Sequence, residues 1–310
     1  MLRPIHLLAI SGILFLTSCG DEVKLRVIET SEYSAKIEIT YKISKEYAMG
    51  DIFFKDTAGR SFSFISAFEL SGKEGCDTIQ VNGLIPDRKS YIGCQIFAND
   101  KTVESEVVEC TTKPLPEGAV DLGLSVKWAS CNLGADSPYY SGDFYSWGNT
   151  APSENYQLYT MQYTKDMNLV TDRPTGTYNL PKNLDAAAVT LGDGWRMPTE
   201  EEAKELVEKC EWAYVDINPR SWLVTGPSGK SIILPMVGYM DGNLRSNNHS
   251  AIRIAGYYWT STSAEIKETS LHMFPKYTHN RATSLGLTEK AHFVSSDKRH
   301  LGLPIRPVKN

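Results

Sequence analysis

Histidine side chains, which could bind a metal ion, are concentrated near the C-terminal end of the chain. All five histidines beyond residue 20 lie between positions 249 and 300, namely His249, His272, His279, His292 and His300. A zinc-type centre needs three or four converging ligands, often with a thiolate or carboxylate among them. These histidines are at least seven residues apart in a region expected to form loops. The spacing favours ordinary polar surface over a metal site.

A glycine-rich segment, GPSGKS at residues 226–231, contains the Gly-Lys-Ser of a phosphate-binding loop. Such a loop also needs a glycine five residues before Gly229 and a helix after the serine. Position 224 is a valine, and residues 232–235 continue as an apolar run that ends in proline. We predict a hairpin between two strands at this segment and no nucleotide site.

Patterns that identify common enzyme classes are missing from the sequence. It contains neither the GxSxG motif of serine hydrolases nor the HExxH motif of zinc proteases. The EPN, QPD and WND triplets of calcium-dependent sugar-binding lectins are also missing. We therefore predict no catalytic residues and no cofactor, while sugar binding by another route stays open.

Five cysteines follow residue 20: Cys76, Cys94, Cys110, Cys131 and Cys210. In an oxidising compartment they could form disulfides, and their odd number leaves at least one thiol free. The alternation of strand residues places Cys94 and Cys110 inward on neighbouring strands. Two small buried apolar residues are favoured there over a disulfide bridge, which remains the alternative.

Residues 1–18 have the features of a signal peptide. Arg3 precedes an apolar run over residues 7–16, which is too short to cross a bilayer as a helix. The sequence LTSC at residues 16–19 follows and resembles the lipobox of bacterial lipoproteins. The resemblance implies cleavage before Cys19 and acylation of its thiol. Several acyl chains make a lasting membrane anchor, because each buried methylene contributes about 0.8 kcal/mol.

The acidic pair Asp21-Glu22 follows the expected lipid-bearing residue, so residues 19–22 form an acylated tether. An acidic pair at this place resembles the surface-export signal of Bacteroidetes lipoproteins. The resemblance implies a protein anchored in the outer membrane and displayed at the cell surface, with the periplasmic face as the alternative.

Composition sets limits on the rest of the chain. Its 310 residues include 41% apolar and 22% charged residues, and the formal net charge is −5. This length fits two domains that each bury a core. Ordinary apolar content argues against wholesale disorder, and the negative charge argues against a nucleic-acid-binding surface.

Short alternating stretches between residues 23 and 112 predict an N-terminal β-sandwich. Strict period-two alternation over residues 33–43 is the clearest of these signals. We expect seven strands, at 23–29, 34–43, 51–55, 61–68, 78–81, 91–98 and 103–111. The segment GLIPDRKSY at residues 83–91 resembles the turn of fibronectin type III domains into their sixth strand. The family usually has tyrosine where this chain has Ser90, and Tyr91 lies one place later.

A linker with two prolines, residues 113–117, ends the last of these strands, because proline cannot donate a ladder hydrogen bond. Residues 118–310 form a second domain that contains all six tryptophans of the chain.

Five sequence blocks occur in order along this second domain. They are VDLGLSVKWASCNLGA at 120–135, GDFYSWG at 142–148, GDGWRMPTEEE at 192–202, GYYWTST at 256–262 and LPIRPV at 303–308. This ordered set resembles the Fibrobacter succinogenes major paralogous domain. The resemblance implies an α+β domain with a C-type lectin-like fold, in which the first and last strands pair and irregular loops build one face. The whole chain is therefore expected to be mainly β.

A helix is expected to begin after Thr199, which forms a capping box with Glu202, and to run to Lys209. Apolar residues at 203, 206, 207 and 210 give it an inner face. Trp195, just before this helix, is expected to fill the core rather than to contact a ligand. Cys131 and Cys210 lie beside the first strand and at the helix end, so a disulfide between them and two free thiols are equally compatible with the sequence.

The fold resemblance also raises one enzymatic activity, that of formylglycine-generating enzymes. These enzymes use cysteine sulfur late in the chain, and no cysteine follows Cys210 here. Without a thiolate the reaction has no nucleophile. We therefore do not expect an enzyme.

The hypothesis that follows is a non-catalytic, lipid-anchored surface protein whose lectin-like domain binds an extracellular glycan or protein. Residues 264–302 are rich in polar and aromatic side chains and lie where retroelement-diversified proteins of this fold vary their ligand residues. The candidate ligand face is Tyr277, His279, Asn280, Arg281, Lys298, Arg299 and His300. A solvated loop is the alternative interpretation of these seven residues. A fimbrial or surface-assembly subunit, joined to its neighbours through a sheet edge, is the alternative function.

Overall fold

The computed structural model describes residues 20–44, 49–55, 61–70, 72–98, 101–116, 118–153, 155–156, 177–216, 219–246, 255–264 and 281–310. Most of its regular structure is antiparallel β-sheet, which confirms the expectation of a mainly β protein. Among these residues no helix has the length and apolar character needed to cross a bilayer. Cys19 lies outside the described residues.

The chain divides into two compact units. The first consists of Met1–Glu29, Lys36–Gln80 and Ser90–Cys110, and the second of Thr30–Ala35, Val81–Lys89 and Thr111–Asn310. The main division therefore falls just before the proline-containing linker expected at residues 113–117. Thr30–Ala35 and Val81–Lys89, which the sequence places within the sandwich at 23–112, group with the second unit.

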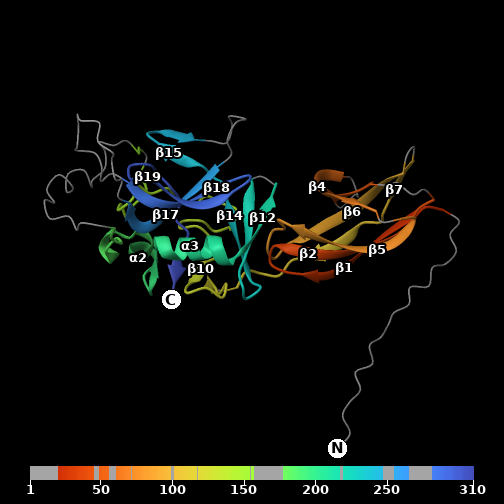
Figure 1. Cartoon of the computed structure of the whole chain (residues 1–310), viewed down its shortest axis with the longest axis horizontal. Helices are drawn as coiled ribbons and strands as arrows, with labels where there is room; N and C mark the ends of the chain where they lie inside the picture. The colour runs from red at the N-terminus through yellow and green to blue at the C-terminus, as the bar shows by residue number, and fades with distance from the viewer. Residues whose placement is uncertain are drawn as a thin grey trace, which may run out of the picture. The chain divides into compact units, whose positions relative to one another are not determined.

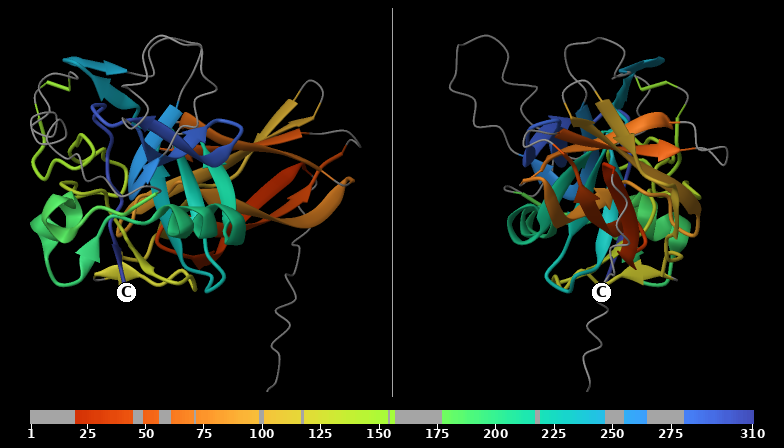
Figure 2. Two further views of the ribbon diagram at one scale, coloured as in Figure 1. Left: turned by 60° about the vertical axis from the view of Figure 1, so that its left-hand side comes forward. Right: turned by 90° about the vertical axis from the view of Figure 1, so that its right-hand side faces the viewer.

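Two sheets form the first unit. One has the strand order β1-β2-β5, made of Glu22–Thr30, Ser34–Lys42 and Glu74–Asn82. The other has the order β4-β3-β6-β7, with β8 also paired to β6. Its strands are β3 (Met49–Lys55), β4 (Ser61–Glu69), β6 (Lys89–Ala98), β7 (Lys101–Glu104) and β8 (Val108–Thr111). Figures 1 and 2 show the two sheets as separate layers.

The alternation expected for residues 33–43 is confirmed in β2. Its apolar residues Ala35, Ile37, Ile39 and Tyr41 are at most 1% exposed, which places one face of the strand in the core.

The strand expected at residues 103–111 is divided into β7 and β8, and this part of the expectation was wrong. The backbone amide of Ser105 donates to the carbonyl of Cys94, at 2.9 Å, and its hydroxyl accepts from the amide of Cys94 at 2.9 Å. Ser105 thus pairs with both the backbone carbonyl and the backbone amide of Cys94, and it interrupts the regular hydrogen-bond ladder of the strand. Cys94 and Cys110 are both buried free thiols.

The second unit is built from several small sheets and short helices. The first sheet has the order β11-β20-β10-β9, made of Trp195–Arg196, Val308–Lys309, Lys127–Ala129 and Ala119–Val120. The second is β12 (Glu211–Val215), β13 (Ser221–Thr225) and β14 (Ser231–Pro235). The third is β17 (Ala255–Ala264), β18 (Arg281–Thr288) and β19 (His292–Lys298). A hairpin of β15 (Tyr239–Asp241) and β16 (Leu244–Ser246) completes the strands of the described part.

The helix expected after Thr199 is confirmed as α3 (Glu200–Lys209). Both hydrogen bonds of the capping box are present, at 3.2 Å from the amide of Glu202 to Thr199 Oγ1 and at 2.8 Å in the reverse direction. Its apolar residues Ala203 and Leu206 are fully buried. The helix packs across the β17-β18-β19 sheet, as Figure 1 shows. The hairpin expected at residues 226–231 is also confirmed, because Thr225 pairs with Ser231 at the start of its turn.

Arg306 lies at the centre of the second unit and is 1% exposed. Its guanidinium donates four hydrogen bonds, all to neutral oxygens. These run to Asn132 Oδ1 at 2.8 Å and to the carbonyls of Ala129, Ser130 and Ile233 at 3.1, 3.0 and 2.7 Å. Burial lowers the pKa of Arg306 from its ordinary value. One side chain thus joins the segment after β10 to β14.

A cluster of aromatic rings surrounds His292 at the start of β19. Its imidazole stacks on Trp212 with the ring centroids 4.2 Å apart and lies 5.4 Å from the ring of Trp222. Nδ1 of His292 is buried and has no hydrogen-bond partner among the described residues. Burial lowers the pKa of His292 below its ordinary value. The fold therefore favours the neutral imidazole.

This preference predicts a loss of stability in mild acid. The unfolded chain binds a proton at His292 near the ordinary pKa of about 6.5, whereas the folded chain binds it only at lower pH. The stability that depends on the neutral imidazole is complete above the pKa of the unfolded chain. It is lost as the pH falls from that value towards the lower pKa of the folded chain. We expect His292→Phe, which keeps the ring stacking, to reduce the loss of urea midpoint between pH 7.5 and 5.5. An unchanged loss in the variant would contradict this assignment.

Candidate functional site

The candidate ligand face derived from the sequence is only partly visible in the structure. Tyr277, His279 and Asn280 lie outside the described residues. Lys298 is exposed at the end of β19. Arg281 is half-buried, and its guanidinium donates to the hydroxyl of Ser296 at 3.1 Å and to the carbonyl of the same residue.

Arg299 does not have the exposure that the ligand-face hypothesis requires of it. It is 2% exposed, and the guanidinium carbon lies 4.2 Å from the ring centroid of Trp147. Its Nε donates to the carbonyl of Arg281 at 2.9 Å. The positive charge is therefore held by an indole face and a backbone oxygen inside the fold.

His300 is also buried, with 8% of its surface exposed. Its Nε2 lies 3.6 Å from Oδ1 of Asp241, and burial lowers the pKa of the imidazole. Its carbonyl accepts a hydrogen bond from the hydroxyl of Ser146 at 2.9 Å. Arg299 and His300 thus stabilise the fold, and the expectation that they face a ligand is corrected by their burial.

The two cysteines considered for a disulfide are free thiols in the structure. Cys210 packs at the end of α3 against the cluster that contains Trp212 and Leu206. Burial raises the pKa of its thiol to about 11, which keeps it protonated and unreactive.

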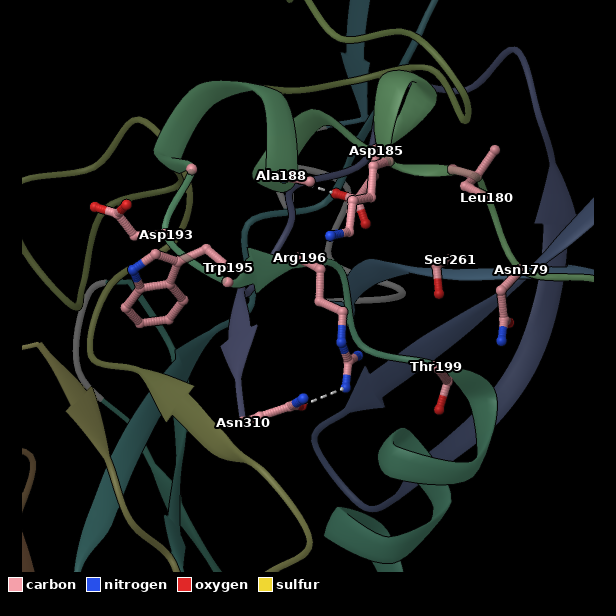
Figure 3. Close-up of a pocket in the computed structure, with 13 residues that line it drawn as sticks. Asn179, Leu180, Asp185, Ala188, Asp193, Trp195, Arg196, Thr199, Ser261 and Asn310 are labelled. Atoms are coloured by element: carbon pink, nitrogen blue, oxygen red, sulfur yellow. Dashed lines mark hydrogen bonds between the residues drawn. The ribbon is translucent and has the colours of Figure 1, made fainter.

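A pocket of about 440 Å³ lies elsewhere in the second unit, where α2 (Ala186–Leu191) meets β11. This volume is in the range of small-molecule sites. Figure 3 shows the side chains that line it, which come from the segments at 179–188, 192–199 and 261 and from residue 310. Polar side chains predominate, among them Asn179, Lys182, Asp185, Asp193, Arg196, Thr199, Ser261 and Asn310.

Asp185 fixes one wall of the pocket. It is 3% exposed and caps α2 by accepting from the amide of Ala188 at 3.0 Å, and it also accepts from the amide of Met197 at 2.9 Å. Burial raises the pKa of Asp185, and the two amide hydrogen bonds oppose that shift. Both carboxylate oxygens are engaged, so the role of this residue is to join α2 to the segment after β11.

Trp195 is brought to the pocket by a tight turn after α2. Gly192, Asp193 and Gly194 have φ values of +61°, +44° and +82°, which reverse the chain within three residues. The indole of Trp195 is half-buried, and Nζ of Lys309 lies 5.8 Å from its ring centroid. The expectation that Trp195 fills the core was wrong, because the turn leaves its ring at the rim of the pocket.

Arg196 crosses the pocket and is held in place by a bidentate pair with Glu202, at 2.6 and 2.7 Å. One of its nitrogens also donates to Asn310 Oδ1 at 3.2 Å, which Figure 3 marks with a dashed line. The carboxylate of Glu202 raises the pKa of Arg196, so the guanidinium stays charged. The same Glu202 closes the capping box of α3, so the helix start fixes the geometry of the pocket.

Sequence reasoning missed this pocket as a site. Asn179, Arg196 and Asn310 are far apart along the chain, and no spacing rule relates them. The signal that could have indicated it is the Gly192-Asp193-Gly194 turn, since a tryptophan directly after a left-handed turn is well placed to be exposed. Within the described part of the chain, no group of three His, Cys, Asp or Glu residues could hold a metal ion.

Comparisons with known proteins give little information. No family model matches the chain, and no curated protein matches it. Two solved structures of the sensor domain of the anti-sigma factor RsgI4 from Pseudobacteroides cellulosolvens, a short and a long form, each share 13% identity with it. They cover 31% and 32% of this chain and 96% of their own, with a TM-score of 0.25 in both cases. At this level of similarity they carry no inference about the chain.

Proposed function

We propose that this chain is a non-catalytic, lipid-anchored protein of the bacterial cell envelope whose second domain binds an extracellular saccharide in the α2–β11 pocket. The anchor rests on the sequence at residues 1–19 and the binding function on the pocket. The outer membrane, facing the cell exterior, is the proposed location because of the acidic residues after Cys19.

Strand order supports the proposed domain types. The first unit has a three-stranded sheet, β1-β2-β5, and a five-stranded one, β4-β3-β6-β7 with β8 also paired to β6. Counting the short strands β7 and β8 as one interrupted strand leaves three strands and four, which supports a fibronectin type III sandwich. In the second unit β10 pairs with β20, with Trp128 opposite Val308, so strands from its two ends lie side by side. This pairing is what a C-type lectin-like domain requires. The first domain then acts as a spacer between lipid and binding site.

The observation that carries the binding function is the composition of the pocket. A half-buried indole, that of Trp195, lines the same pocket as the exposed side-chain amides of Asn179 and Asn310. A sugar ring presents an apolar C–H face, which packs on an aromatic ring, and hydroxyls, which pair with amides. Catalysis finds no support here, because the acid Asp185 has both oxygens engaged by backbone amides.

Removing the indole tests the pocket. We expect Trp195→Ala to weaken binding of the complete chain to its glycan on an array, and then in solution, by at least tenfold. Tyr140→Ala is the control, because Tyr140 is an aromatic residue that is 60% exposed outside the pocket lining. The unfolding midpoint of both variants shows whether the fold is intact. Undiminished binding by a folded Trp195→Ala variant would exclude this pocket as the site.

Removing the thiol tests the anchor. We expect the Cys19→Ser chain to be absent from the membrane fraction that detergent extracts and to incorporate no labelled fatty acid. The reason is that a hydroxyl in place of the thiol is not a substrate for the lipid transfer. Cys76→Ser, which changes another exposed cysteine, is the control and stays with the membrane. Membrane retention of the Cys19→Ser chain would contradict the proposed anchoring.

A further inference from the structure

The pocket contains polar groups whose hydrogen-bonding capacity is already used and others whose capacity is free. Most of the side-chain acceptor oxygens already accept one hydrogen bond, and the exception besides Asp193 is Ser261 Oγ, which donates to the carbonyl of Pro198 at 3.3 Å. Oδ1 of Asn179 accepts from Thr262 at 2.5 Å, and Oδ1 of Asn310 accepts from Arg196 at 3.2 Å. Both oxygens of Asp185 accept from backbone amides, and Oγ1 of Thr199 accepts from the amide of Glu202 at 3.2 Å.

The donors are mostly free. With their oxygens bound as described, Asn179 and Asn310 keep their Nδ2 groups available. Arg196 directs its terminal nitrogens to Glu202, Met197 and Asn310, and its Nε–H has no partner among the described residues. Lys182 is exposed and forms no ion pair within the described part of the chain.

One uncommitted carboxylate belongs to the lining, that of Asp193. It is exposed on the turn after α2, and in Figure 3 it points away from Arg196 and Asn179. Apart from Asp193 and the oxygen of Ser261, the free side-chain groups of the lining are therefore donors, and one of them, Lys182, is a cation without an ion pair in the described part of the chain.

This imbalance selects among saccharides. A hydroxyl that accepts a hydrogen bond also brings a proton, which needs an acceptor of its own once it is removed from water. A carboxylate brings only acceptors, and its charge strengthens each bond that it receives. Resting on the proposed function, we infer that the pocket binds an oligosaccharide that carries uronic acid, with one sugar ring against Trp195 and a carboxylate received by Lys182 and the free amide donors.

The test compares trigalacturonate with its fully methyl-esterified form, which has the same sugar rings without the charge. We expect the complete chain, purified in detergent, to bind trigalacturonate at least tenfold more tightly by calorimetry in low salt. The preference should shrink as sodium chloride is raised to about 0.5 M, because salt screens exposed charges. Lys182→Gln should lose most of the preference for the acid over the ester. Lys230→Gln, at an exposed lysine of the β13–β14 turn, should keep it.

The outcomes separate this inference from the proposed function. Equal affinity for the acid and its ester, with Trp195→Ala weakening both, would overturn the uronate assignment while the saccharide site stands. Tighter binding of a sulfated galactotriose than of trigalacturonate would also overturn it. If neither the acidic nor the neutral trisaccharide binds, the uronate inference fails, and the glycan array with Trp195→Ala decides the proposed function separately. A preference that persists in Lys182→Gln would show that this lysine does not receive the carboxylate.

Discussion

Replacing Arg306 by methionine is expected to lower the free energy of unfolding of the second unit by about 4 kcal/mol. Methionine fills much of the same volume but leaves four buried oxygens without donors, and each such orphaned group costs about 1–3 kcal/mol. The measurement is the urea dependence of tryptophan fluorescence. All six tryptophans lie at position 128 or later, so this signal reports the second unit alone.

Arg306→Lys separates charge from geometry in the same experiment. An ammonium group keeps the charge but presents donors from one point, whereas the guanidinium reaches Asn132, Ala129, Ser130 and Ile233 through three separate nitrogens. We therefore expect lysine to recover little of the lost stability.

The matched control is Arg220→Met, since Arg220 pairs with Asp216 at 2.6 Å and Glu289 at 3.2 Å on the surface. Exposed pairs contribute little, so the midpoint should hardly move. An Arg306→Met variant with the midpoint of the control would show that the hydrogen bonds of Arg306 are dispensable.

The parts of the fold that the sequence predicted correctly depend on neighbours along the chain. Thr199 and Glu202 are three residues apart and form both bonds of their capping box within one turn of helix. The alternation of β2 likewise follows from strand geometry alone. Such patterns need no knowledge of the tertiary structure, which is why α3 and most strands of the first unit lie where they were expected.

The parts that failed depend on partners distant in sequence. Arg299 carries a charge and a loop-like context, so its composition indicates exposure. Its burial results from Trp147, more than one hundred positions earlier, whose ring compensates the charge. Trp195 shows the reverse case, because a large aromatic residue was assigned to the core and lies at a pocket rim. The strand β11 contains only Trp195 and Arg196, and hydrophobicity alone does not predict which of its two faces packs against the core.

The pocket was missed for the same reason. Its donors come from Asn179, Lys182, Arg196 and Asn310, and each has an ordinary local context. Which of these side-chain groups are free to bind a ligand depends on which atoms already form hydrogen bonds in the folded structure. A single sequence contains no signal for this pattern of hydrogen bonds.

Gly142→Ala is the second substitution with a large expected effect, a loss of about 3 kcal/mol or more in the second unit. The residue has φ of +62°, where a side chain costs about 1–2 kcal/mol. A Cβ there would also lie 2.2 Å from the carbonyl oxygen of Leu133. Overpacking of this kind adds about 1–3 kcal/mol.

The oxygen of Leu133 has little freedom to move away. It accepts from the amide of Asp143 at 3.0 Å, and the amide of Leu133 itself donates to the carbonyl of Ile305 at 2.9 Å. The neighbouring Asn132 donates to the carbonyls of Tyr140 and Ser141 while its oxygen receives Arg306. The loop before Gly142 and the buried Arg306 therefore belong to one hydrogen-bonded network. We expect displacement of this loop to weaken the hydrogen bond from Arg306 to Asn132.

Gly229→Ala is the matched control because it isolates backbone strain from collision. Gly229 has φ of +79°, but a Cβ there meets nothing within 4 Å. It should cost about 1 kcal/mol, the strain alone. The double variant Gly142→Ala/Arg306→Met should lose less than the sum of the two single losses, because both changes disrupt the same contacts. Equal losses for Gly142→Ala and Gly229→Ala would show that the loop moves freely, and additive losses in the double variant would show that the two sites are uncoupled.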